Sequence, residues 1–193
     1  MKIYKISENF QEMKEWFEKR TNNHIALVQK WCNKIENYDP ERFKGLVERS
    51  KTHDQSKFEE PEMTPYIYTT WQYKCKDDGK EYNPPQDTKD KMNEATFHHV
   101  KHNAHHPENH TDQTQNILNR EDRDKPPETL VDATKMKDID IGEMVADWFG
   151  MSDEKKSNPK DWADKNINIR WKFTDEQKDL IYELIEEVWD GKP

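Results

Sequence analysis

The chain reads THDQSKF from Thr52 to Phe58, and about forty residues later it reads FHHVKHNAHHPENH from Phe97 to His110. Six of the eight histidines lie in the second stretch, and the first contains a single His-Asp pair. Imidazole nitrogens and carboxylate oxygens are ligands that transition metals accept together. These two stretches therefore raise the question of whether the fold brings them into one site.

Apolar residues at helical spacing surround both stretches, and strand patterns are almost absent. The first helix is expected to begin at Ser7 and to end near Asn37, with His24 in its apolar stripe. Asp39 followed by Pro40 predicts the start of a second helix that ends at the His53-Asp54 pair. Further helices are expected from Pro61 to about Cys75, from Thr88 to Pro107, from Asp140 to Met151, and after a capping box of Thr174 with Gln177.

These patterns predict an all-α fold, a single-domain helical bundle with long polar loops that covers residues 1–193. The core around the candidate site is expected at about 7–152, and the C-terminal helix, about 174–189, is expected to pack on it. The segment Glu108–Lys137 is polar and is interpreted as a solvated excursion that could cover a site.

Composition excludes several classes of protein. The formal net charge of -9 argues against a general nucleic-acid-binding surface. No apolar run is long enough to span a bilayer and the N-terminus has no signal-like apolar region, so we expect a soluble, cytoplasmic protein. Two cysteines without a CxxC arrangement predict neither a disulfide framework nor a cysteine zinc site.

Four residues on three separate predicted helices are candidate metal ligands: His24, the adjacent His53 and Asp54, and Asp147. Each has an ordinary explanation, because a histidine in an apolar stripe is commonly a hydrogen-bonded core residue and a buried carboxylate commonly pairs with a cation. Their occurrence in one order, on faces that can converge, favours a divalent transition metal such as Mn, Zn, Fe, Ni or Co. The alternative for the histidine-rich stretch is a solvated tract that binds metals without a defined site.

Helix geometry divides the histidine-rich stretch into two faces if the helix continues to Pro107. His99 and His106 are two turns apart on one face, and Met92 and Ala95 direct that face towards the core. His98 and His102 are expected to be more exposed, and the position of His105 stays open.

The order His24, His53-Asp54, Asp147 resembles the HD superfamily of metal-dependent phosphohydrolases, whose all-helical fold binds one metal through these four positions. More closely, the blocks HDQSKF, HHVKHNAHH, EMVADWFGMS and NPKDW look like a phage-associated family of unknown function, which implies the cytoplasm of a host cell. This resemblance covers about His24 to Trp162.

Within the superfamily, binuclear phosphodiesterases have a His-Asp-x-x-Lys motif, and HDQSK supplies its lysine as Lys57. The resemblance implies a second metal at His99, His105 and His106, although here the histidine groups share one segment and do not lie on different helices.

The expected function is hydrolysis of a small nucleotide, a nucleoside mono- or triphosphate, by metal-activated water. The resemblance implies that Lys57 binds a phosphate oxygen, while Asp54, His99 and His106 take part in catalysis. Tyr66 and Trp71 are expected to bind the base by stacking. Glu59, Glu60 and Glu62 are nearby candidates for an acid.

Two other classes stay open. The same scaffold can hold a di-iron centre that reacts with dioxygen, or the protein can be a non-catalytic factor that binds a nucleotide or a host protein. A homodimer is compatible with the sequence and is neither predicted nor excluded.

Overall fold

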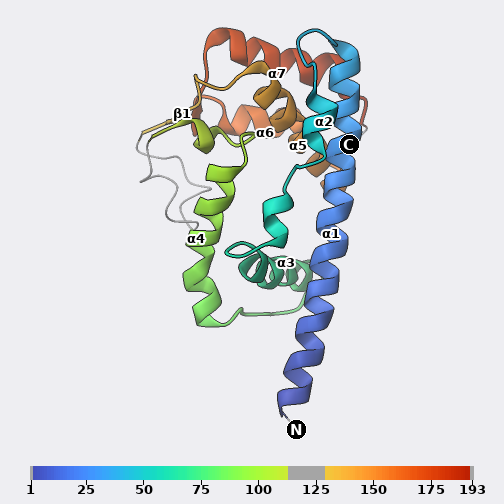
Figure 1. Cartoon of the computed structure of the whole chain (residues 1–193), viewed down its shortest axis with the longest axis vertical. Coiled ribbons are helices and arrows are strands. Elements are labelled where there is room, and N and C mark those ends of the chain that lie inside the picture. The colour runs from blue at the N-terminus through green and yellow to red at the C-terminus, as the bar shows by residue number, and fades with distance from the viewer. Residues whose placement is uncertain (1, 113–128, 192–193) are drawn as a thin grey trace.

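The computed structural model describes residues 2–112 and 129–191, with side chains from residue 10 onward. These residues are mostly helical, so the expected all-α, single-domain bundle is confirmed (Figure 1). Residues 113–128, the middle of the polar excursion predicted at Glu108–Lys137, lie outside the described residues. The expectation that this excursion covers a site therefore concerns residues that the structure does not describe.

Helix α1 (Lys2–Tyr38) runs along the longest axis of the molecule (Figure 1). Its 37 residues correspond to a length of about 55 Å at 1.5 Å per residue. The helix begins five residues before Ser7, where the sequence placed its start, and ends one residue after the expected Asn37.

Two separate apolar clusters pack against α1 at different heights. The larger one joins the second half of α1 to helices near the C-terminus and includes Val28, Trp31, Phe43, Phe149 and Leu180. The smaller one joins the first half of α1 to helix α3 (Met63–Asp77) and consists of Met13, Phe17, Ile67, Trp71 and Cys75. His24 lies on α1 between these clusters, so a polar layer is sandwiched between two apolar ones.

The prediction of one continuous second helix is wrong. Residues 39–45 form turns, and helix α2 contains only Leu46–Ser50. The break occurs at Gly45, whose φ of 90° is left-handed, and the Glu36 carboxylate accepts the N–H groups of Gly45 at 3.2 Å and Val47 at 2.6 Å. The His53-Asp54 pair therefore lies in a turn between α2 and the 3-10 helix η1 (Gln55–Phe58), and not at the end of a helix.

Helix α4 (Gln86–His102) also ends earlier than predicted. Asn103 is extended, and its side-chain amide donates to the His99 carbonyl at 2.8 Å and to the Ser56 hydroxyl at 3.0 Å. The chain then turns into the 3-10 helix η2 (Pro107–His110). The residue before a proline is disfavoured in the helical conformation, which agrees with the extended backbone at His106.

The C-terminal part contains α5 (Asp138–Lys155), α6 (Pro159–Asn166) and α7 (Asp175–Glu187). The capping box of Thr174 and Gln177 at α7 is confirmed. Helix α6 was not predicted, although its Asn158 cap accepts the N–H of Lys160 at 2.9 Å. A short parallel pair of strands, β1 (Val131–Asp132) and β2 (Trp171–Lys172), joins the segments before α5 and α7.

None of the described helices is both long and apolar enough to cross a bilayer. The two cysteines are free, as expected, and are buried in different clusters, Cys32 in the larger and Cys75 in the smaller.

Candidate metal centre

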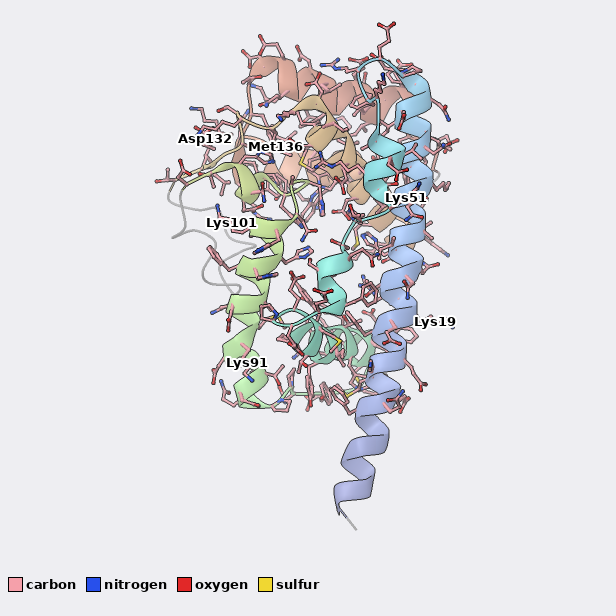
Figure 2. The ribbon with its side chains drawn as sticks, in the orientation of Figure 1. Lys19, Lys51, Lys91, Lys101, Asp132 and Met136 are labelled. Carbon is pink, nitrogen blue, oxygen red and sulfur yellow. The ribbon has the colours of Figure 1, made fainter. Side chains whose placement is uncertain are left out.

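Asp54 occupies the middle of the polar layer between the two apolar clusters. It is 1% exposed and has a left-handed backbone with φ of 58°, a conformation that few residues other than glycine adopt. This turn aims the carboxylate at histidines from several segments of the chain. Figure 2 shows the side chains that fill the space between α1, marked by Lys19, and α4, marked by Lys91 and Lys101.

One oxygen of Asp54 faces a first group of ligand-type side chains. Oδ2 lies 4.0 Å from Nε2 of His24 and 3.6 Å from Nε2 of His53. Asp147 on α5 closes the group, with its Oδ1 2.8 Å from Nε2 of His24 and 4.0 Å from Nε2 of His53. His24, His53 and Asp147 thus offer ligand atoms within 4.8 Å of one another, and Asp54 faces both histidines of this group.

The other oxygen of Asp54 faces a second group. Oδ1 lies 3.3 Å from Nε2 of His99 and 3.7 Å from Nε2 of His105. Nε2 of His106 lies 3.0 Å from Nε2 of His99. Asp54, His99, His105 and His106 all offer ligand atoms within 4.8 Å of one another, so the Asp54 carboxylate connects two adjacent sets of ligands.

Two buried glutamates support the opposite sides of the histidine rings. Oε1 of Glu143 lies 2.9 Å from Nδ1 of His53 and 3.5 Å from Nδ1 of His105. Oε2 of Glu62 lies 2.9 Å from Nδ1 of His99. A carboxylate that accepts from Nδ1 leaves Nε2 as the free lone pair, which is the arrangement found behind histidine ligands of metals.

Two buried polar atoms at the junction lack a hydrogen-bond partner among the described residues, namely Nε2 of His53 and Oδ1 of Asp54. Leaving such atoms unpaired in a protein interior is costly, so a missing partner is expected. Imidazole nitrogens with carboxylate oxygens fit a divalent transition metal, whereas Mg²⁺ and Ca²⁺ prefer oxygen ligands alone. The residues present therefore fit an ion of the predicted class.

The charges in the layer hold its carboxylates ionised. Burial favours the neutral acid, but Lys57 and the surrounding imidazoles outweigh burial and keep the pKa of Asp54 well below its usual range. The hydrogen bond from His24 likewise lowers the pKa of Asp147 against the effect of burial. Burial lowers the pKa of His24, yet Asp147 and then Glu154 raise it to about 9. A proton on the His24 imidazole thus balances part of this buried negative charge.

Lys57 follows Asp54 in η1 and contacts the same carboxylate. Its Nζ lies 2.5 Å from Oδ2 of Asp54 and 5.7 Å from the centre of the Tyr66 ring. Burial lowers the pKa of Lys57, but the Asp54 carboxylate more than compensates and the pKa is raised. A permanent ammonium group therefore stands beside the two ligand groups.

A cavity of about 310 Å³ opens on this layer and is lined by Asp54, Lys57, Tyr66 and Asp147 among other residues. Trp71, expected to stack on a base, does not line it. Trp71 is instead part of the smaller apolar cluster, where Lys74 lies 5.0 Å from its ring centre.

Residues 13–187 match a family described as a family of unknown function (DUF5662). The chain belongs to this family. No curated protein and no solved structure matches the chain. The matched segment contains every residue of both ligand groups, so the candidate metal centre lies within the region that matches the DUF5662 family.

The structure places the remaining histidines differently from a simple division by helical face. His102 is exposed and His98 is half-buried, close to the expectation, but Nδ1 of His98 lies 2.6 Å from Oε1 of Glu62. His105, left open, is buried against Asp54 and Glu143. His106 meets His99 as expected, although it does so through the turn after α4 and not through a shared helix.

Sequence reasoning missed three charged residues that support the site. The first two are Glu143, which lies four residues before Asp147, and Glu154, which lies seven residues after it. Both therefore share one face of α5 with Asp147. That spacing was a usable signal. Arg49 holds Glu143 and Asp140, each at 2.6 Å, and no pattern in the sequence connects it to them.

Proposed function

We propose that this protein is a metal-dependent phosphohydrolase of the HD type that acts on a small nucleotide. One observation carries the proposal: the Asp54 carboxylate lies between two groups of imidazoles while the Lys57 ammonium group contacts the same carboxylate at the cavity. The chain order His24, His53-Asp54, Asp147 supports the HD assignment.

The first group, His24, His53, Asp54 and Asp147, would hold one divalent transition metal. Asp54 with His99, His105 and His106 would hold a second. When bound, such ions supply Lewis acidity towards a phosphate oxygen and acidify a water at neutral pH. The rest of the chemistry falls to side chains of this chain.

Lys57 is placed to bind a phosphate oxygen. Its side chain is 21% exposed, whereas the Asp54 carboxylate that it contacts is almost completely buried, so a ligand in the cavity can reach the ammonium group but not displace Asp54. A fixed ammonium group aimed at the developing charge stabilises the transition state. His106 is less buried than His99 or His105 and also lines the cavity. In the alternative with a single ion in the first group, His106 is free of metal and is suited to donate a proton to the leaving oxygen.

The test is release of phosphate or pyrophosphate by the purified protein, loaded separately with Mn²⁺, Zn²⁺, Fe²⁺, Ni²⁺ or Co²⁺, from a panel of nucleoside mono- and triphosphates and cyclic dinucleotides. Asp54→Ala should abolish release, while Asp90→Ala, which removes an exposed carboxylate of α4, should not change it. Absence of release with every metal and substrate would refute the proposal.

One oxygen of Asp54 faces His24 and His53 and the other faces His99 and His105, and a carboxylate placed in this way also suits a pair of iron ions. This placement makes a di-iron oxygenase the second candidate. Dioxygen consumption by the iron-loaded protein, without phosphate release, would establish that candidate. Tight nucleotide binding without turnover, unaffected by Asp54→Ala, would indicate a non-catalytic binding factor.

A further inference from the structure

The cavity extends well beyond the metal ligands, along one face of α5. Asp147, Trp148, Met151, Ser152 and Lys155 all line it. The eight residue-to-residue steps from Asp147 to Lys155 correspond to about 12 Å along the helix axis. One end of the cavity therefore lies at the candidate metal centre, and the other is far enough away to hold a different part of the same ligand.

Aromatic rings wall the cavity beside and beyond Asp147. Trp148 and Trp171 are buried and stacked, with ring centres 5.8 Å apart and planes 12° from parallel. Trp162 on α6 stands against Trp171, 6.4 Å between ring centres and 64° between planes, and is 41% exposed. All seven tryptophans lie in the described part of the chain, and Trp162 is the exposed one.

An exposed indole on the wall of a cavity leaves apolar surface in water that a ligand can cover. The Trp171 ring that contacts Trp162 is held in place, since its Nε1 donates to Glu108 at 3.0 Å and its ring is stacked on Trp148. The exposed Trp162 ring is thus packed against a fixed neighbour.

Cations are sparse and separated along the cavity. Lys57 lies at the metal end and Lys155 at the far end, where Ser157 also lines the wall. Arg20 lines the cavity too, but it is bound to Glu154 at 3.2 Å. Lys155 has no ion-pair partner among the described residues.

We propose that the far end is a subsite for a planar heteroaromatic ring, stacked on Trp162, with Lys155 bound to an acceptor atom on that ring. The ligand is then a single nucleoside monophosphate, with its phosphate at Lys57. Its size agrees with a cavity of about 310 Å³, which is at the small end of ligand sites. This inference rests on the proposed function for the place of the phosphate.

The test compares two non-hydrolysable phosphonates, one an analogue of adenosine monophosphate and the other of ribose 5-phosphate, by calorimetric titration into metal-loaded protein. Loss of one stacking partner weakens binding of a base by about tenfold or more. Trp162→Ala should therefore weaken the adenosine analogue by that factor and leave the ribose analogue unchanged. Trp162→Phe should restore most of the affinity, because it keeps an aromatic face.

The matched control is Tyr73→Ala, which removes another exposed aromatic side chain, 55% exposed on α3 and outside the cavity lining, and should change neither affinity. Equal weakening of both analogues by Trp162→Ala, no weakening of either, or no binding of the adenosine analogue to the unaltered protein would overturn the subsite. Binding that depends on Trp162 without any hydrolysis in the phosphate-release assay would refute the proposed function and leave the subsite standing.

Discussion

Glu143→Gln tests whether one buried carboxylate positions ligands of both groups. Oε1 of Glu143 faces Nδ1 of His53 in the first group and Nδ1 of His105 in the second, while Oε2 accepts from Nε of Arg49 at 2.6 Å. A carboxamide has one accepting oxygen. It must therefore turn its NH₂ either towards Arg49 or towards the two histidines, and in both cases a donor faces a donor.

The expected loss is large for both groups. Removing the partner behind a metal-bound histidine costs about 10- to 100-fold in metal affinity. Because Glu143 serves His53 and His105, the affinities of both groups should fall by a factor in this range. Glu62→Gln is the matched variant. Glu62 is also buried, and it accepts from the Ser56 hydroxyl at 3.1 Å, but among the described residues the histidines that it contacts are His98 and His99 of α4, so the first group should keep its affinity.

The assay titrates metal-free protein with Co²⁺, following the visible absorption of the bound ion and competing with a chelating indicator. Circular dichroism and thermal unfolding of each metal-free variant establish that it is folded. Elemental analysis then counts the ions retained after gel filtration.

The reasoning is refuted if folded Glu143→Gln binds metal to either group as tightly as the unaltered protein. It is refuted equally if Glu62→Gln weakens both groups by the same factor, because that result would mean that the two carboxylates do not divide the histidines between them.

Three further predictions follow from buried groups. Metal-free protein should be most stable between about pH 4 and 6.5. The pKa of His24 is raised to about 9, so the contribution of His24 to the free energy of unfolding is complete below about pH 6.5 and is lost as pH rises through 9. The pKa of Asp147 is lowered, so the contribution of Asp147 is complete above about pH 4 and is lost only in acid. Thermal unfolding across pH measures both limbs, and a flat alkaline limb would contradict the assignment. Gly142→Ala should cost about 1–3 kcal/mol in urea unfolding, because the added Cβ would lie 2.8 Å from the Phe43 ring; an unchanged midpoint would show that the ring moves freely. Cys32 is fully buried, which raises the pKa of its thiol, so it should not react with a disulfide reagent at pH 8 until denaturant is added; rapid labelling of the native protein would contradict this.

The local sequence pattern was sufficient to predict a helix wherever the apolar periodicity and the caps of that helix stabilise it. The capping box at Thr174 and the apolar face of α7 are examples, since both depend on residues within one or two turns. The same kind of pattern failed at Gly45, where a distant carboxylate from Glu36 stabilises the turn that divides the expected second helix. It failed again at Asn103, whose amide bonds to Ser56 across the molecule and ends α4.

The ligand residues were partly visible in the sequence because their chemistry is unusual in an interior. A histidine in an apolar stripe, such as His24, or a carboxylate among apolar neighbours, such as Asp147, needs a buried partner, and this need can be seen without a structure. The identity of the partner cannot, because the distances among His24, Asp54 and Asp147 depend on how three segments pack.

By itself, the sequence determined an all-helical chain, its lean apolar content and the residue types available to bind a metal. These follow from composition and from spacing over a few turns. Only the tertiary structure decided that Asp54 stands between two groups of histidines, that His105 faces inward, and that Glu143 supports both groups. Each of these depends on side chains from segments far apart in the chain, and their meeting is set by the packing of two apolar clusters around a polar layer.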